Sequence, residues 1–127
     1  MKNLYFIYGT LKKKMKNEHI MKKVNGEFIE KVKTKIKYPM FDLLSGFPYI
    51  QDKKGYGLIV KGELYKIDEQ YIKKLDEFEG VPTLYKRGKI NVKSKEKNYK
   101  NVNCYFISSE LTINELTKVD LFEEWVE

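Results

Sequence analysis

The chain has 127 residues and a mass of 15.2 kDa, which allows one hydrophobic core but not two independent domains. A hydrophobic fraction of 42% with 14% aromatic residues excludes a disordered polymer. Lysine and arginine (25) exceed aspartate and glutamate (18), giving a net charge of +7. Because the lysines occur in almost every segment, the charge favours a solvated lysine coat over a nucleic-acid groove, and only residues 12–16 form a dense run.

A single cysteine and a single histidine restrict the chemistry further. Cys104 has no partner for an intramolecular disulfide, and with His19 alone it is too little for a Cys/His zinc cluster. We therefore expect no metal and a reducing, cytoplasmic setting. The apolar run at the start of the sequence is too short for a signal peptide, and no stretch reaches transmembrane length, so we expect no membrane partner.

Apolar patterning in the first half of the chain predicts one short helix among strands. The first apolar run stops at Gly9, as expected of a buried strand that leads into a turn. Asn17 can cap the helix, and Asn25-Gly26 can end it. In chain order the predicted elements are a strand over 4–8, a helix over 18–24, and strands over 28–36 and 40–44.

The second half predicts a strand over 55–67 and a helix over 69–78 capped by Asp68. The strand has Leu64 on one face and Tyr65 on the other, which indicates a central or barrel position. The helix carries Leu75 and Phe78 on one face, which should pack on the sheet.

Two further strands and a docked tail complete the domain. One strand contains Ile90 and Val92, the other has Val102, Cys104 and Phe106 at alternate positions, and a polar connection over 93–100 joins them. The tail over 111–127 has enough apolar side chains to dock as one or two helical turns. Mostly strands with two or three helices predict a single α+β domain over 1–127, built around a curved antiparallel or mixed sheet.

Several common catalytic motifs are missing from the sequence. It contains no GxxxxGK[ST] phosphate loop, no HExxH metal helix and no GxSxG nucleophile elbow. Cys104 lies at an inward position of its predicted strand, which is typical of a buried, inert thiol, and we expect His19 at the surface. The remaining candidates are carboxylates and backbone donors.

Two stretches carry most of the functional information, YGTLK at 8–12 and LDEFEG at 75–80. Together with YPMFDLLSGFPYI (38–50), GYGLIVKGELYKID (55–68) and LYKR (84–87), they resemble the gamma-glutamylcyclotransferase-like, or AIG2-like, family and most closely its gamma-glutamylamine cyclotransferase branch. The resemblance implies a small β-barrel-like mixed sheet flanked by two or three short helices. It also implies one pocket between the first strand's loop and the region after the second helix.

The resemblance further implies an intramolecular reaction without a cofactor, in which the α-amine of a γ-glutamyl group attacks its own γ-carbonyl. The products are 5-oxoproline and an amine, amino acid or peptide. Glu79 matches the family's catalytic glutamate, which accepts one proton and donates it again. The apolar neighbours Phe78, Val81 and Pro82 should raise the pKa of its carboxyl group. The alternative is that Glu79 only solvates a helix end.

The remaining candidate residues are expected on the substrate side of the pocket. The N–H groups of the strand-end loop would bind a carboxylate or an oxyanion, although an ordinary turn is the alternative. The Gly46-Phe47-Pro48 turn and Tyr85 are equally compatible with simple packing, and Asp76 and Glu77 are expected to be solvated. The predicted substrate-binding residues are Tyr8, Gly9, Thr10, Leu11, Phe47, Pro48 and Tyr85.

The sequence is therefore compatible with two functional hypotheses. The first is a cyclotransferase acting on a small γ-glutamyl compound, with the leaving group left open. The second is an inactive cyclotransferase-like domain that binds a partner such as nucleic acid through its basic surface. A pocket blocked by side chains would favour the second hypothesis. The sequence leaves the oligomeric state open.

Overall fold

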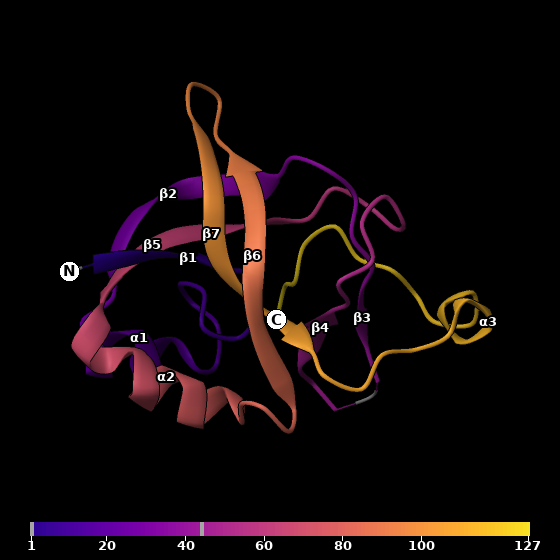
Figure 1. Cartoon of the computed structure of the whole chain (residues 1–127), viewed down its shortest axis with the longest axis horizontal. Helices are drawn as coiled ribbons and strands as arrows, with labels where there is room; N and C mark the ends of the chain where they lie inside the picture. The colour runs from indigo at the N-terminus through magenta and orange to yellow at the C-terminus, as the bar shows by residue number, and fades with distance from the viewer. Residues whose placement is uncertain (1, 44) are drawn as a thin grey trace.

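Five strands close into a small barrel, which confirms the predicted α+β class and the barrel-like mixed sheet (Figure 1). The computed structural model describes residues 2–43 and 45–127. In barrel order the strands are β1 (Lys2–Ile7), β5 (Lys61–Asp68), β2 (Glu27–Thr34), β6 (Tyr85–Lys93) and β7 (Asn98–Ile107). Neighbouring strands are antiparallel except β1 and β7, which pair in parallel where Tyr5 meets Asn103 and so close the barrel.

Buried side chains form three hydrophobic clusters, and those that alternate along the barrel strands belong mainly to the two larger ones, the first and second cores. Leu64 belongs to one core while its neighbours Tyr65 and Ile67 belong to the other, as the predicted alternation of this strand requires. Cys104 is fully buried in the first core, as predicted, and burial raises the pKa of its thiol. The first core consists of Phe6, Tyr8, Val32, Tyr38, Met40, Ile50, Val60, Leu64, Ile90, Val92, Val102, Cys104 and Phe106.

Helices α1 (Glu18–Lys23) and α2 (Ile72–Glu79) lie together on one side of the barrel and bury the second core (Figure 1). Met21 of α1 and Leu75 of α2 are its helical contributions. A short 3₁₀ turn (Glu69–Tyr71) precedes α2, and the Asp68 side chain accepts a hydrogen bond from the Gln70 N–H at 3.2 Å, which confirms the predicted cap.

The predicted cap of α1 is wrong. The Asn17 side chain makes no capping hydrogen bond, and its Nδ2 instead donates to Thr10 Oγ1 at 3.0 Å. The backbone N–H of Asn17 also donates to the Thr10 carbonyl oxygen, at 2.9 Å. Asn17 therefore fastens the loop after β1, because the hydrogen bond from Nδ2 orients its side chain toward Thr10 and its Oδ1 accepts no backbone N–H of the helix.

The predicted strand over 55–67 is wrong in its first half. Gly55 and Gly57 have φ values of 88° and 95°, so the chain turns here, and β5 begins only at Lys61. Beyond this turn, Leu58 and Tyr38 exchange backbone hydrogen bonds of 2.9 and 3.2 Å in an isolated bridge. A run of apolar residues interrupted by glycines resembles a strand in sequence, but positive φ angles end the extended conformation.

A small second sheet replaces the single strand predicted over 40–44. It pairs β3 (Met40–Asp42) with β4 (Pro48–Ile50), in antiparallel register from Met40 opposite Ile50 to Asp42 opposite Pro48. Strand β4 was not predicted, because its three residues are too few for a periodic pattern. Leu44, the last residue of the predicted strand, lies outside the described residues.

The predicted β6 and β7 are confirmed, with a connection of residues 94–97 that is shorter than expected. Helix α3 (Ile113–Leu116) follows and begins with a capping box between Thr112 and Glu115. The rest of the tail lies along the barrel without further helix, and the Phe122 N–H donates to the Met40 carbonyl at 2.9 Å.

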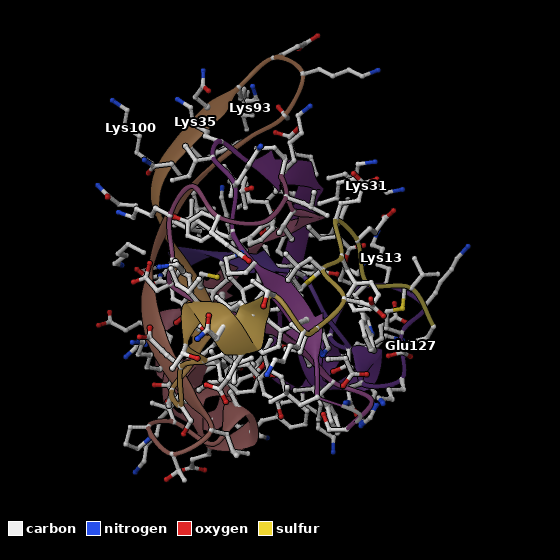
Figure 2. The ribbon with its side chains drawn as sticks, turned by 90° about the vertical axis from the view of Figure 1, so that its right-hand side faces the viewer. Lys13, Lys31, Lys35, Lys93, Lys100 and Glu127 are labelled. Carbon is white, nitrogen blue, oxygen red and sulfur yellow. The ribbon has the colours of Figure 1, made fainter. Side chains whose placement is uncertain are left out.

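The lysine coat is real but not uniform. Lys13, Lys31, Lys35 and Lys100 project outward from different sides of the molecule (Figure 2). Lys12 differs, because it is only 4% exposed and its Nζ donates to the Trp125 carbonyl oxygen at 2.6 Å. Burial lowers the pKa of this ammonium group. The dense lysine run therefore contains one buried residue that joins the loop after β1 to the C-terminal segment.

None of the helices in the described ranges is long and apolar enough to cross a membrane.

Candidate active site

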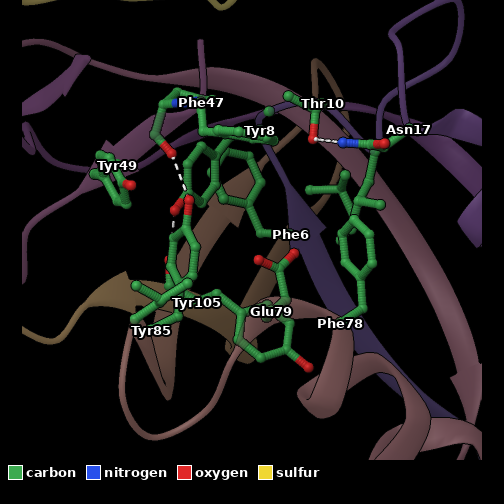
Figure 3. A pocket seen from close by; sticks show the side chains of 15 residues that line it. Phe6, Tyr8, Thr10, Asn17, Phe47, Tyr49, Phe78, Glu79, Tyr85 and Tyr105 are labelled. Carbon is green, nitrogen blue, oxygen red and sulfur yellow. Dashed lines mark hydrogen bonds between the residues drawn. The ribbon is translucent and has the colours of Figure 1, made fainter. Parts of the chain in front are cut away.

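All the residues predicted for the site line one cavity of about 280 Å³ (Figure 3). It lies where the loop after β1, the β4 segment, the end of α2 and the start of β6 meet. Gly46, from the predicted turn, is not part of the lining. The lining consists of Phe6, Ile7, Tyr8, Gly9, Thr10, Leu11, Asn17, Phe47, Pro48, Tyr49, Phe78, Glu79, Leu84, Tyr85 and Tyr105.

Glu79 is the last residue of α2, and its carboxylate points into the cavity (Figure 3). Gly80 ends the helix in the left-handed conformation, with φ of 70°, and so turns the chain away directly after Glu79. Among the described residues, none makes a hydrogen bond or ion pair to this carboxylate. Burial, and secondarily the negative charge of Asp76, raises the pKa of Glu79 to about 8.

The loop after β1 lines the same cavity as Glu79 and has backbone N–H groups that are not used as donors. In the described part of the chain, the N–H groups of Gly9, Thr10 and Leu11 have no hydrogen-bond acceptor. Gly9 packs closely on Pro48, since a Cβ atom at Gly9 would lie 2.7 Å from Pro48 Cγ. Asn17 holds the loop through the side chain and the carbonyl of Thr10, as described above. The loop is thus fixed from behind and keeps three amide donors free.

Tyrosine hydroxyls join the walls of the cavity. Tyr8 donates to the Tyr105 carbonyl oxygen at 2.6 Å, and Tyr85 donates to the Pro48 carbonyl oxygen at 2.9 Å. Tyr49 stacks on Tyr85 with ring centroids 5.3 Å apart. Burial raises the pKa of both Tyr8 and Tyr85, so these phenols stay neutral and act as fixed donors between the walls.

The expectation that Asp76 is solvated is wrong. Its side chain is only 19% exposed, its Oδ1 accepts a hydrogen bond from the Tyr105 hydroxyl at 2.6 Å, and its Oδ2 lies 3.4 Å from Arg87 Nη2. Glu77, by contrast, is exposed, as predicted. The partners of Asp76 come from β6 and β7, so helical spacing alone does not identify them. The sequence feature that could have indicated a role for Asp76 in the site was its position three residues before Glu79, on the same helix face.

The mouth of the cavity is apolar. Phe78 is 40% exposed and lines the mouth with Phe47 and Leu84, so the prediction that it packs on the sheet is wrong. The reason is that the last turn of α2 lies over the cavity and not over a strand. The exposed rim residues Phe47, Phe78 and Leu84 suit a ligand with carbon atoms near the entrance, and Lys16 Nζ lies 4.4 Å from the centroid of the Phe47 ring.

His19 is exposed and is not among the residues that line the cavity, in agreement with its predicted surface position. Within residues 2–43 and 45–127, no three His, Cys, Asp or Glu side chains converge as metal ligands would.

The raised pKa of Glu79 predicts a pH-dependent difference in stability between the wild type and Glu79→Gln. Between pH 4.5 and about 8 the folded protein holds a proton that the unfolded chain releases, so the wild-type free energy of unfolding falls as pH rises through this window. Glutamine does not titrate. Between pH 5 and pH 8 we therefore expect the free energy of unfolding of Glu79→Gln to increase by roughly 1–3 kcal/mol relative to that of the wild type.

Urea unfolding of both proteins at pH 5, 6.5 and 8 measures this gain. Glu77→Gln is the matched control, because it removes the same charge from an exposed position of the same helix. Parallel stability curves for wild type and Glu79→Gln would contradict the raised pKa.

The fold and cavity define a class of small barrel proteins in which a glutamate carboxylate and a loop with free backbone donors line one cavity. The sequence profile described as "Gamma-glutamyl cyclotransferase, AIG2-like" matches residues 5–127. The chain therefore belongs to the AIG2-like gamma-glutamyl cyclotransferase family, which confirms the predicted resemblance.

Individual relatives agree with this assignment. The chain is 40% identical over 92 residues to the gamma-glutamylaminecyclotransferase A of Danio rerio, covering 69% of this chain and 57% of the relative. It is 33% identical over 95 residues to the gamma-glutamylaminecyclotransferase of Homo sapiens, covering 70% of this chain and 61% of that protein. The matches thus span about three fifths of each relative's length.

Solved structures share the fold. The crystal structure of an AIG2-like protein from Mus musculus superimposes with a TM-score of 0.82 at 25% identity, covering 98% of this chain and 88% of the other. A structure described as gamma-glutamyl cyclotransferase has a TM-score of 0.66 at 22% identity, covering 84% of this chain and 67% of the other. The second similarity concerns the fold alone.

Proposed function

We propose that this protein is a γ-glutamyl cyclotransferase that acts on a small γ-glutamyl amine or a related γ-glutamyl compound. The observation that carries the proposal is the unpaired Glu79 carboxylate, which shares one cavity with the free N–H groups of residues 9–11. Family membership and the names of the relatives support the same reaction. A reducing, cytoplasmic location goes with this proposal.

The reaction is a ring closure within one substrate molecule. The α-amine nitrogen forms a bond to the γ-carbonyl carbon, and the bond from that carbon to the leaving nitrogen then breaks, releasing 5-oxoproline and an amine. Because nucleophile and carbonyl are already tethered, positioning supplies much of the rate and no second reactant has to be bound. The protein's remaining task is to move one proton and stabilise one developing negative charge.

Glu79 would move the proton. The α-ammonium has to lose a proton before it attacks, and the leaving nitrogen has to gain one. The pKa of an amine lies several units above that of an ordinary carboxyl group, so a carboxylate with an unperturbed pKa is a poor base for this step. A pKa of about 8 brings Glu79 much closer to the amine and lets one carboxyl group serve as base and then as acid.

The loop after β1 would bind the negative charges. The free amides of Gly9, Thr10 and Leu11 suit either the α-carboxylate of the substrate or the oxyanion that forms from the γ-carbonyl. Tyr8, Phe47, Pro48 and Tyr85 would form the walls that hold the glutamyl group beside Glu79.

The alternative of an inactive binding module has less support. A cavity blocked by side chains would favour it, but the cavity is open. None of the described residues makes a hydrogen bond or ion pair to the Glu79 carboxylate. The lysines are distributed over several elements and sides of the molecule (Figure 2).

The proposal is tested by incubating the protein with a panel of γ-glutamyl amines, γ-glutamyl dipeptides and glutathione and measuring released 5-oxoproline. We expect turnover of at least one member, and the pattern of accepted members identifies the leaving group. No release from any member, with folded protein at pH 6 to 9, would overturn the proposed activity. Salt-sensitive oligonucleotide binding by such an inactive protein would support the binding module.

A further inference from the structure

Asp76 and Glu79 lie three residues apart on α2 and therefore share one helix face. Side chains at this spacing are neighbours, with Cβ atoms roughly 5–6 Å apart. Two carboxylates at such a distance repel one another, and both are half-buried here, where water screens the repulsion poorly. The negative charge of Asp76 therefore adds to burial in raising the pKa of Glu79.

Asp76 is held in place, whereas Glu79 is free. The Tyr105 hydroxyl and the Arg87 guanidinium occupy the two carboxylate oxygens of Asp76, at 2.6 and 3.4 Å. Arg87 is itself placed by a hydrogen bond of 3.4 Å from Nη1 to the Tyr5 hydroxyl, and the Tyr5 ring stacks on Tyr105 with centroids 5.9 Å apart. Elements β1, β6 and β7 thus fix the position of Asp76, and none of their side chains fixes the Glu79 carboxylate.

The other titratable groups that interact electrostatically with Glu79 are neutral. They come from the segment after β1 and from β6 and β7, and burial raises the pKa of each of them. They are Tyr8, Tyr85, Cys104 and Tyr105. In the part of the chain that the structure describes, Asp76 is therefore the charged group that acts on Glu79, after burial itself.

We infer that Asp76 is a positioning residue for Glu79: clamped by Tyr105 and Arg87, it holds a negative charge one helical turn from the Glu79 carboxylate and sets the pH range over which Glu79 carries its proton. Arg87 opposes this effect, because its positive charge partly neutralises Asp76. The ion pair also joins the LDEFEG stretch to the LYKR stretch. This inference rests on the proposed function for its catalytic meaning but not for its electrostatics.

Opposite substitutions should shift the titration in opposite directions. Asp76→Asn removes the repelling charge, so the midpoint of the Glu79 titration should move to lower pH, by about one unit for charges at this separation. Arg87→Gln leaves Asp76 uncompensated, so the same midpoint should move to higher pH. Glu77→Gln removes an exposed charge from the same helix and should leave the midpoint unchanged.

Two readouts test the inference. The first is the carboxyl ¹³C NMR titration of Glu79, assigned with Glu79→Gln, in the wild type and the three variants. The second is the pH dependence of 5-oxoproline release, whose acidic limb should shift in parallel. An unchanged midpoint in Asp76→Asn, or shifts of the same sign in Asp76→Asn and Arg87→Gln, would overturn the inference.

The two readouts also separate the inference from the proposed function. A wild-type protein that releases no 5-oxoproline but shows the opposite NMR shifts would overturn the function and support the electrostatic coupling. Where Asp76→Asn fails to fold, Arg87→Gln remains informative, because Arg87 is partly exposed and its predicted shift has the opposite sign. Thermal unfolding of each variant shows which case applies.

Discussion

Glu79→Gln is expected to reduce 5-oxoproline release by at least about 10²- to 10⁴-fold, the usual contribution of general acid–base catalysis. Glutamine keeps the size of glutamate and its hydrogen-bonding reach but cannot carry the proton between the two nitrogens. Because the carboxylate makes no hydrogen bond or ion pair within the described residues, the substitution removes no structural contact. The measurement is the rate at saturating substrate, compared with the wild type at the same pH.

Two further variants make the result specific. Glu79→Asp retains the charge but withdraws the carboxylate by one methylene, and it should also be strongly impaired if proton transfer needs close geometry. Glu77→Gln should retain wild-type turnover, since this residue is exposed and outside the cavity lining. Near-wild-type rates in Glu79→Gln would mean that another group handles the proton.

Gly57→Ala is expected to lower the free energy of unfolding by roughly 2–4 kcal/mol, through left-handed strain together with steric overlap. Gly57 has φ of 95°, and an added Cβ would lie 2.4 Å from the Tyr38 carbonyl oxygen and 2.7 Å from Pro39 Cα. Those atoms are backbone and do not move aside as a side chain would. The urea midpoint of unfolding measures the loss.

Gly55→Ala is the matched control for this substitution. Gly55 has a similar φ of 88°, but no atom lies within 4 Å of the position of an added Cβ. Gly55→Ala should therefore lower the free energy of unfolding only through left-handed backbone strain, by about 1–2 kcal/mol. Equal losses in the two variants would show that the contact with Tyr38 does not constrain Gly57.

Local sequence patterns correctly predicted features that depend on residues close together in the chain. The alternation of Leu64 and Tyr65 and the Asp68 cap are short-range features, and each has the predicted structural role. The glycine turn before β5 was missed because a positive φ has no signature in a run of apolar residues. Local sequence is least informative where the backbone conformation depends on a distant neighbour.

The candidate site shows the same difference between features that are local in the sequence and contacts between distant residues. The resemblance to the family predicted one pocket between the loop after the first strand and the region after the second helix, and residues of both segments line the cavity. Contacts between segments were not predictable in this way. Asp76 meets Tyr105 from β7, and Lys12 meets the Trp125 carbonyl oxygen 113 positions away. Charged residues in a helix or in a lysine run are usually solvated, and only the tertiary partners reveal these two exceptions.

The parallel pairing of β1 with β7 determines when the cavity can form during folding. These strands are joined only after almost the whole chain has been traversed, and Tyr5 meets Asn103 across 98 positions. High contact order of this kind slows folding, because loop-closure entropy is lost before the contacts form. The β7 residue Tyr105 also lines the cavity, so a nascent chain has no complete cavity until its last strand has emerged. Recovery of turnover during refolding would thus report closure of the barrel, not formation of the helices.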